Sequence, residues 1–370
     1  MIVQVKTKRQ RQQFLDLPKK LYRHDANWIC PLDTDINQVF DPQKNNFHNH
    51  GECIRWLLVD DNEIIGRIAA FIDYDKAYLH DPPLGGIGFF ECINCQDAAS
   101  QLFNTAKSWL QEKGMGGMDG PINFGENDNF WGLLIEGFSA PSYGMNYHKP
   151  YYFDLFKAFG FQVVYEQITN YLDVNKPFPD RFTRIAEWVS KKAGYEFRHF
   201  EKKKLAQFAD DFMAIYNDAW KDFDSFKPIK METILESFKK MKLIMDENLI
   251  WFAYVNGDPA SFILILPDAN QLIKNFNGKL TWWNGIRFMV NRRKKVNKMR
   301  AIVMGTKRAY QKHGLESALF IKLKEYVLPL NKYQQLELSW VGDFNKEMLS
   351  IHKATGAEFA KKHATLRYLF

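Results

Sequence analysis

A cluster of basic and polar residues near the C-terminus has the composition and spacing of a phosphate-binding loop. It follows an apolar strand at 301–305 and precedes an amphipathic helix that begins at Leu315. A loop in this position directs free backbone N–H groups and the positive end of a helix toward one point, which suits a pyrophosphate. An ordinary strand-to-helix turn with solvated lysines is the alternative for the same pattern. The candidate binding residues are Gly305, Thr306, Lys307, Arg308, Gln311, Lys312, His313 and Gly314.

Strands and helices surround this loop in an order that the spacing of apolar residues predicts. The second half is expected to hold helices at 205–216, 231–241 and 315–327, a hairpin at 251–263, and strands at 301–305 and 336–340. In the last of these strands, Glu337 and Ser339 alternate with apolar residues and therefore share the polar face. The first half is expected to hold strands at 2–5 and 87–92, a hairpin at 56–68, and helices at 9–22 and 97–112.

The two halves are predicted to be copies of one fold unit. Their hairpins, at 56–68 and 251–263, align without a gap at an offset of 195 residues. A helix followed by glycine ends at Gly160 in the first half and at Gly356 in the second, an offset of 196 residues. Two separate markers at nearly the same spacing indicate that one supersecondary unit is repeated.

Segment 175–180 divides the copies, because its two prolines interrupt any regular element, so we predict domains of residues 1–175 and 181–370. The second domain is expected to run through strand, basic loop, helix, strand, a helix begun by Asn345, Gly356 and a final strand pair. This order resembles that of the GNAT acyltransferase superfamily. The resemblance implies an α/β (α+β) fold, in which each domain is a GNAT-like unit with a mixed, largely antiparallel twisted sheet flanked by helices.

Two motifs carry the resemblance. The cofactor loop of that superfamily reads Arg or Gln, two further residues, Gly, one residue, and then Gly or Ala. The chain matches it at Gln311 and Gly314 and departs at Glu316, whose acidic side chain stands where the superfamily keeps a small residue near a cofactor phosphate. The second motif, roughly Asn-x-x-Ala-x-x-Leu-Tyr-x-x-x-Gly-Phe, falls on Asn345, Met348, Ile351, His352, Gly356 and Ala357.

The resemblance implies an acyl-coenzyme A co-substrate, either acetyl-coenzyme A or a longer acyl form, and no metal. Its pyrophosphate would bind residues 307–314 near Asn345, and its pantetheine arm would lie between the two strands that flank the loop. The attacking amine must lose a proton, and the leaving thiolate benefits from a proton donor. His352, where the superfamily often has a general-acid Tyr, is the candidate acid, with a surface helix histidine as the alternative. Glu337 is the candidate base, with a structural ion pair as the alternative.

The first domain has the same order of elements without a basic glycine loop. Its strand at 87–92 continues into segment 93–97, which is acidic and lacks glycine, so we predict a degenerate cofactor loop there. Segments 119–124 and 132–138 resemble a block found in bacterial tandem GNAT-like proteins of uncharacterised substrate. The aromatic segment 141–152 is predicted to line an acceptor cleft between the halves, or else to pack at their junction.

Composition limits the remaining possibilities. The chain has 370 residues, 46% of them hydrophobic and 25% charged, and its apolar runs are far shorter than the roughly 20 residues that cross a bilayer. The polar N-terminal segment contains no signal peptide, so we expect a cytoplasmic protein without a transmembrane segment. Cys92 and Cys95 have zinc-knuckle spacing but no second such pair, so reduced structural thiols are expected.

We therefore predict an acyl-coenzyme A-dependent N-acyltransferase, most simply one that transfers acetyl to an amine of a small molecule or peptide. Two alternatives stay open: an aminoacyltransferase of related fold that uses charged transfer RNA, and a non-catalytic GNAT-like binding protein. The excess of 50 basic over 43 acidic residues, with seven basic side chains in 287–300, favours an anionic partner. For that segment a solvated helix face is the simplest interpretation, and an acidic substrate, a lipid head group or RNA are the alternatives.

Overall fold

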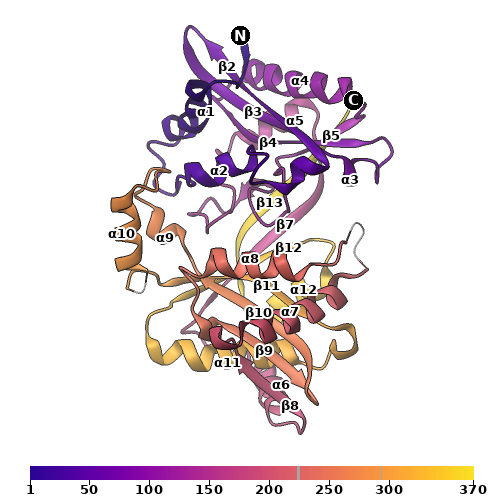
Figure 1. Ribbon diagram of the computed structural model, residues 1–370, viewed down its shortest axis with the longest axis vertical. Coiled ribbons are helices and arrows are strands. Elements are labelled where there is room, and N and C mark those ends of the chain that lie inside the picture. Colours follow the sequence, from indigo (N-terminus) through magenta and orange to yellow (C-terminus); the bar gives the residue numbers. More distant parts are fainter. Residues whose placement is uncertain (223–225, 293) are drawn as a thin grey trace.

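The computed structural model describes residues 1–222, 226–292 and 294–370, and one twisted sheet runs along the length of the molecule (Figure 1). Its strands lie in the order β1-β2-β3-β4-β5-β13-β7-β12-β11-β10-β9-β8, and β6 pairs with β13 beside this path. The strands are β1 (Ile2–Gln4), β2 (Gly51–Asp60), β3 (Glu63–Asp73), β4 (Leu84–Cys92), β5 (Gly117–Gly120), β6 (Leu133–Glu136), β7 (Gln162–Asp173), β8 (Tyr195–His199), β9 (Ile250–Val255), β10 (Asp258–Pro267), β11 (Lys298–Thr306), β12 (Gln335–Gly342) and β13 (Glu358–Leu369).

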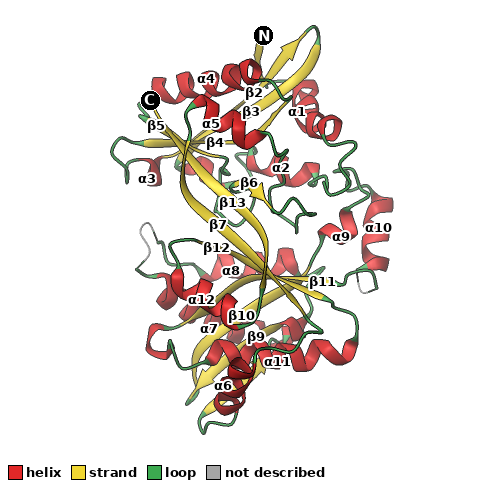
Figure 2. Ribbon diagram, turned by 180° about the vertical axis from the view of Figure 1, so that it is seen from behind, coloured by secondary structure: helices red, strands yellow, loops and turns green. Residues whose placement is uncertain are grey.

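Helices cover both faces of each half of this sheet (Figure 2). The side chains of β9 and β10 alternate between two apolar clusters, one shared with α6 and α11 and the other with α7 and α8, as the two-residue period of a strand requires. The helices are α1 (Lys8–Leu21), α2 (Asp33–Val39), α3 (Tyr74–Ala77), α4 (Gln96–Glu112), α5 (Tyr152–Phe159), α6 (Asp180–Ser190), α7 (Leu205–Trp220), α8 (Met231–Met241), α9 (Asn270–Ile273), α10 (Trp282–Asn291), α11 (Leu315–Leu330) and α12 (Lys346–Ala354).

Two parallel strand pairs each form a fork. In the first half, β4 pairs with β5 only from Leu84 to Gly86, and in the second half β11 pairs with β12 only from Lys298 to Arg300. Beyond these three-residue stretches the strands of each pair diverge, and every other pairing between strands of the described residues is antiparallel. The mixed, largely antiparallel sheet flanked by helices is therefore confirmed.

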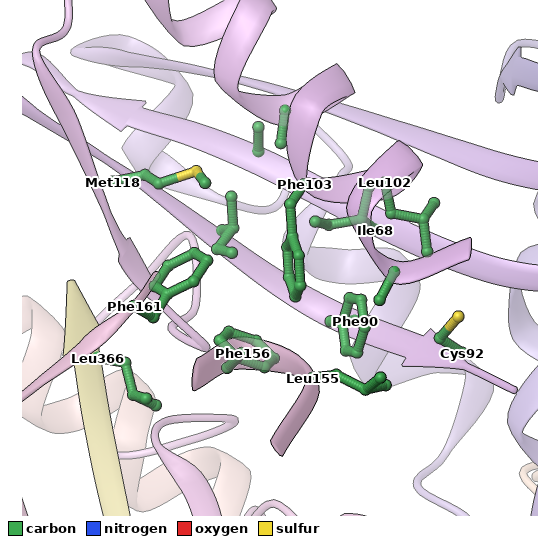
Figure 3. Close-up of a cluster of buried hydrophobic side chains, with 14 of the residues drawn as sticks. Ile68, Phe90, Cys92, Leu102, Phe103, Met118, Leu155, Phe156, Phe161 and Leu366 are labelled. Atoms are coloured by element: carbon green, nitrogen blue, oxygen red, sulfur yellow. The ribbon is translucent and has the colours of Figure 1, made fainter. Parts of the chain in front are cut away.

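The last strand of the chain joins the two halves. β13 lies between β5 and β7, with Leu366 opposite Gly120 and Val163, so the C-terminus lies beside the N-terminal half (Figure 1). Leu366 belongs to the buried cluster of that half, next to Phe156 and Phe161 (Figure 3). The strand pair expected after residue 356 is a single strand of 12 residues, which pairs with β7 along most of its length and with β6 and then β5 on its other edge.

The predicted repeat is visible in the backbone. Both hairpins form, and their turn residues Asn62 and Gly257 have φ angles of 63° and 84°, in the left-handed region that Asn and Gly tolerate. Gly160 and Gly356 end α5 and α12 with φ angles of 113° and 77°. The domain limits at 1–175 and 181–370 stay a prediction, and β7 and β13 each pair with strands of the other range.

Candidate functional site

The C-terminal fork has a β-bulge on its inner strand. Leu264 of β10 is opposite Val303 and Ile265 is opposite Ala301, so Ile302 is the extra residue, and it is 37% exposed. A bulge re-aims the backbone groups next to it. Across the fork, the Ser339 hydroxyl bonds to the carbonyl oxygens of Ala301 and Ile302, the second at 2.9 Å.

The helix that follows this strand starts with open backbone amides. Gly314, at a φ of 78°, precedes α11 and supplies no side-chain cap. The N–H groups of Leu315, Glu316 and Ser317 have no hydrogen-bond acceptor in the described ranges. A 16-residue helix with an uncapped first turn carries positive potential and donors at one point, which is the arrangement that binds a phosphate group.

Several side chains of the predicted loop are held by the protein itself. Lys307 forms an ion pair with Asp258 at 2.9 Å, and Arg308 forms one with Asp222. The His313 ring lies 3.0 Å from the Tyr195 hydroxyl. Gln311 and Lys312 are exposed, and within 1–222, 226–292 and 294–370 no partner is seen for their side chains. The loop therefore offers its backbone and these two side chains to a ligand.

Three residues of the predicted set meet structural needs. The Thr306 hydroxyl donates to the Glu316 carboxylate at 2.6 Å, which holds the acidic side chain toward the strand. A Cβ on Gly305 would lie 2.5 Å from the Trp220 ring, so only glycine fits there. The Asn345 side chain caps α12 by accepting from the Met348 N–H at 3.1 Å. Whether residues 305–314 and Asn345 bind a cofactor stays a prediction.

Glu337 lies in a charged cluster at the base of the fork. Its side chain is 12% exposed and contacts Lys361 at 3.1 Å and Arg300 at 3.9 Å. Burial alone would raise the pKa of Glu337, but the positive charges of Lys361 and Arg300 lower it by more than burial raises it. The pKa of Glu337 therefore lies below its ordinary value. The carboxylate is thus ionised and paired, the arrangement named as the alternative to a base.

His352 lies on the opposite face of the sheet from Glu337. Its ring is 3.2 Å from the side-chain amide of Asn170, and burial lowers its pKa to about 4. Asn170 is paired with Leu338, the neighbour of Glu337, and successive strand residues point to opposite faces. The structure therefore does not bring the two predicted catalytic residues together, and their roles stay predictions.

A pocket opens where the two halves meet, beside the C-terminal fork, and it encloses about 260 Å³, the part open to solvent included. We call it the junction pocket. Arg300 of β11 and Trp340 of β12 line it from the fork, and Gln167 of β7 and His363 of β13 line it from the strands that connect the halves. The remaining lining comes from two loops of the first half, at Asn127, Asp128, Trp131, Gly144, Met145 and Asn146.

The junction pocket presents polar groups with free hydrogen-bonding capacity. The side-chain amide N of Gln167 and the Nε of Arg300 are buried without an acceptor in the described part of the chain. His363 donates from Nε2 to the carbonyl of Asn146 at 3.0 Å, and burial lowers its pKa to about 4, so it is neutral with Nδ1 unprotonated. Asp128 is an exposed residue, but desolvation of its carboxyl group by the neighbouring protein raises the pKa of that group.

These pocket residues were not identified from the sequence. Segment 141–152, predicted to line an acceptor cleft or pack at the junction, contributes Met145 and Asn146 to the junction pocket, while its Tyr147 packs on Tyr22 within the first half. Whether the pocket takes an acceptor stays a prediction. The polar run 126–129, which lies between segments 119–124 and 132–138, was the other feature of the sequence that could have indicated this pocket.

A second pocket adjoins the first and shares Met145 and Asn146 with it, and we call it the apolar pocket because most of its lining residues are apolar. It encloses about 640 Å³, the part open to solvent included. Its charged groups come from Asp33 and from Arg67 and Glu91, which lie 3.6 Å apart. Its apolar wall consists of Leu15, Pro18, Trp28, Ile29, Pro31, Ile36, Phe89, Phe90, Phe130 and Pro141.

The N-terminal fork is filled by its own chain. The Tyr152 hydroxyl accepts from the Cys92 N–H at 3.0 Å, and the Tyr151 hydroxyl donates to the Cys92 carbonyl at 2.8 Å. Ile122 continues beside β4 by donating its N–H to the Ile87 carbonyl at 2.7 Å. The turn at 93–95 that stands in place of the basic loop is closed by hydrogen bonds from the N–H groups of Ile93 and Cys95. The degenerate cofactor loop stays a prediction.

One other group of side chains has the composition of a metal site. His50, Asp73 and Asp75 lie close together at the surface, with Nδ1 of His50 2.8 Å from Asp73. Lys227 pairs with Asp75 at 2.5 Å and Lys76 with Asp73 at 3.8 Å. These ammonium groups already balance the carboxylates, so the group behaves as a surface ion-pair network.

Comparisons with known proteins agree with this architecture. No family model matches the chain. It is 27% identical over 374 residues to a bacterial ceramide synthase from Caulobacter vibrioides, covering 98% of this chain and 95% of the relative. It is 26% identical to Protein YghO from Escherichia coli, covering 95% and 90%.

Solved structures show the same fold at low sequence identity. A tandem GNAT protein from the clavulanic acid biosynthesis pathway superposes with a TM-score of 0.59 at 11% identity, covering 100% of this chain and 98% of the other. A GCN5-related N-acetyltransferase from Sphaerobacter thermophilus gives 0.56 at 10% identity, covering 100% and 95%. The chain therefore has the tandem GNAT-like fold, and the resemblance drawn from its motifs is confirmed.

Proposed function

We propose that this protein is an acyl-coenzyme A-dependent N-acyltransferase whose acceptor is a long-chain amine. The observation that carries the proposal is the open C-terminal fork, with the uncapped start of α11 at one end and the junction pocket at the other. Thr306 ends β11 and Arg300 lines the pocket, so about 20 Å of extended strand separates the two. An extended phosphopantetheine arm has a comparable reach, so a pyrophosphate bound before Leu315 brings the thioester to the pocket.

The reaction needs a polarised thioester carbonyl and a neutral amine. The amine nitrogen bonds to the carbonyl carbon, the carbon–sulfur bond breaks, and the thiolate leaves and takes up a proton. Backbone around the Ile302 bulge is the donor candidate for the carbonyl oxygen. His363 joins Glu337 as a candidate base, because it is neutral and its Nδ1 is unprotonated. The Asp128 carboxylate suits the ammonium form of the acceptor.

The adjoining apolar pocket favours a long hydrocarbon chain on the acceptor or on the acyl group. A polar pocket that shares its wall with an apolar one fits a molecule with an amine at one end and a chain at the other. The relative named bacterial ceramide synthase supports the same class, since a ceramide is the amide of a fatty acid and a long-chain amino alcohol. We therefore propose a fatty acyl donor in preference to acetyl, and an amino alcohol in preference to a peptide.

Coenzyme A binding tests the fork directly. The variant Ser317→Glu adds a negative charge to the open first turn of α11, which stabilises the helix but repels a pyrophosphate. We expect at least about tenfold weaker coenzyme A binding by calorimetry, equivalent to roughly 1.4 kcal/mol, with no fall in the melting temperature. Gln101→Glu, which adds the same charge to an exposed position of α4, is the control and should bind as the parent does.

Turnover then separates the remaining alternatives. Palmitoyl-coenzyme A with sphinganine should yield an amide detectable by mass spectrometry, at a higher kcat/KM than acetyl-coenzyme A. Equal coenzyme A binding by Ser317→Glu and the parent would refute the fork as the cofactor site. Thermal stabilisation by charged transfer RNA but not by acyl-coenzyme A would favour the aminoacyltransferase, and coenzyme A binding without any product would favour the binding protein.

A further inference from the structure

Helix α10 presents an apolar face that the fold does not use. The helix lies at the edge of the molecule beside α9, away from the central sheet in both views (Figures 1 and 2). None of its residues is buried, and Phe288 alone packs on an apolar cluster, formed by Ile29, Leu32, Ile273 and Phe276. The exposed side chains are Trp282 (63%), Trp283 (62%), Ile286 (46%), Met289 (45%) and Val290 (64%).

These five side chains form one continuous stripe. At about 100° per residue they fall within roughly 120° of the helix circumference, and Phe288 points to the other side. The rings of Trp282 and Trp283 stack on each other at 3.7 Å instead of folding back onto the protein. Exposed apolar residues are common one at a time, but two tryptophans and three aliphatic side chains on one short helix mark an interaction surface.

Cations without acidic partners surround the stripe. Residues 269–315 contain twelve Lys or Arg and no Asp or Glu. Within the described ranges, no ion pair is seen for five of these side chains near α10, which are Lys274, Lys279, Arg287, Lys294 and Lys295. Arg292 anchors the helix by donating to the Leu243 carbonyl at 2.6 Å. In the basic segment singled out from the sequence, Arg300 instead lines the junction pocket, and residue 293 lies outside the described residues.

We infer that α10 docks this protein on an anionic membrane surface. A helix with tryptophan and aliphatic side chains on one face and unpaired lysines around it inserts the apolar face among lipid chains while the cations contact the head groups. RNA would also attract the cations, but it offers nothing to Ile286, Met289 and Val290. No helix of the described residues is long and apolar enough to cross a membrane.

The docking helix adjoins the apolar pocket described above. It packs on Ile29, which lines that pocket, and Gly278 just before the helix accepts the Asp33 N–H at 2.8 Å. A lipid-like amine leaving the bilayer at α10 would therefore reach the pocket over a short path. This route rests on the proposed function, whereas membrane docking itself does not.

Flotation of the full chain with vesicles tests the inference. The parent should float with phosphatidylcholine vesicles that contain 30% phosphatidylglycerol, and about tenfold less with pure phosphatidylcholine or at high salt. The double variant Trp282→Ser with Trp283→Ser should lose about tenfold in binding to the anionic vesicles, with an unchanged melting temperature. Lys294→Glu with Lys295→Glu should lose a similar factor.

Two matched controls sit elsewhere on the surface. Trp188→Ser removes a tryptophan that is 64% exposed on α6, and Lys239→Glu with Lys240→Glu reverses the same charge on α8. Both should float as the parent does. Equal binding to neutral and anionic vesicles, or unaltered flotation of the Trp282/Trp283 variant, would overturn the inference. The inference would also be overturned if the parent bound transfer RNA but not vesicles, and if Lys294→Glu with Lys295→Glu abolished that RNA binding. Coenzyme A affinity, measured in parallel, should not change in any of these variants and so reports separately on the proposed function.

Discussion

The two strand forks begin with the same backbone geometry and differ in what lies between their strands. In each, parallel pairing stops after three residue pairs, a bulge follows on the inner strand, and a helix starts beyond it. The N-terminal fork is filled by Tyr151, Tyr152 and Ile122, which bond to the backbone of β4. Across the diverging part of the C-terminal fork, the Ser339 hydroxyl is the bridging side chain that the described residues provide.

A glutamate beside each fork shows the same contrast in its electrostatics. Burial raises the pKa of Glu91, although Arg67 lies 3.6 Å away and Tyr152 donates to its carboxyl. Burial also acts on Glu337, but Lys361 and Arg300 together bring its pKa below the ordinary value. The C-terminal copy therefore keeps an ionised cluster beside the junction pocket, whereas in the N-terminal copy burial opposes the charge of Glu91, which lines the second pocket.

The largest expected effect comes from removing the charge of Glu337, and the same change at Glu91 is its comparison. Glu337→Gln should cost roughly 3–5 kcal/mol of unfolding free energy at pH 7, because Lys361 and Arg300 lose the anion that they share. Glu91→Gln should cost only about 1 kcal/mol, since its charge is disfavoured already and an amide still bonds to Tyr152. Urea unfolding of both variants measures the difference.

The pH dependence of these two costs has opposite signs. The lowered pKa of Glu337 gives stability that is present above its unfolded pKa and is lost as pH falls through the folded one. The raised pKa of Glu91 has the opposite effect: its contribution to stability is present at low pH and is lost as the pH rises through the folded pKa. The cost of Glu337→Gln should therefore shrink as the pH falls from 7 toward 4, and equal costs at every pH would remove the distinction between the forks.

His363, on the strand that joins the two halves, should control stability in mild acid. Its folded pKa of about 4 lies below the ordinary value of 6.5, so the protein loses stability as the pH falls from about 6.5 through about 4. His363→Gln keeps a donor for the Asn146 carbonyl but cannot titrate. Between pH 6.5 and 5 the variant should lose less stability than the parent, by roughly 2 kcal/mol. The exposed His24→Gln serves as control, and parallel curves for His363→Gln and the parent would contradict the buried neutral ring.

Many elements of the sheet were predictable from the sequence because they depend on local periodicity, but β5, β6, β7 and β8 were not predicted. The stripe from Leu315 and the alternation from Leu336 to Trp340 each repeat with the period of their element, and both form as expected. The pairing of β13 with strands of the first half was not predictable, because it joins Leu366 to Gly120, which are far apart in the sequence. Strand partners at such separations leave no periodic signal.

The site was predictable only in part, and for a related reason. The loop at 305–314 is continuous in sequence, so its open amides could be inferred from the strand and helix on either side. The junction pocket is built from single residues of two loops and four strands, such as Asp128, Gln167 and His363. None of these carries a motif, and only the fold assembles them. Glu337 was identified by its polar face, but its pairing with Lys361 depends on β13 and so was beyond reach.

A smaller effect is expected where the N-terminal fork is sealed. Tyr152→Phe removes the hydroxyl that satisfies both Glu91 and the Cys92 N–H while keeping the ring in the core. The loss should be roughly 1–2 kcal/mol of unfolding free energy, because a buried donor is left unsatisfied. Coenzyme A affinity should be unchanged, since that fork is not the proposed cofactor site. A change in affinity above about twofold would show that the two forks are coupled.

The smallest effect should come from the corresponding position in the open fork. Ser339→Ala removes a hydroxyl that is only partly buried, so the stability cost should be about 0.5 kcal/mol. In the free protein this hydroxyl occupies the Ile302 carbonyl, which would otherwise be open to an amide N–H of a bound pantetheine arm. Removing it takes away a competitor, so coenzyme A should bind equally well or up to about threefold more tightly. Tyr151→Phe, which frees the Cys92 carbonyl in the sealed fork, should leave coenzyme A binding unaltered. A tenfold loss in Ser339→Ala would mean that the hydroxyl contacts the ligand, and the fork would then be a preformed site instead of one that its ligand opens.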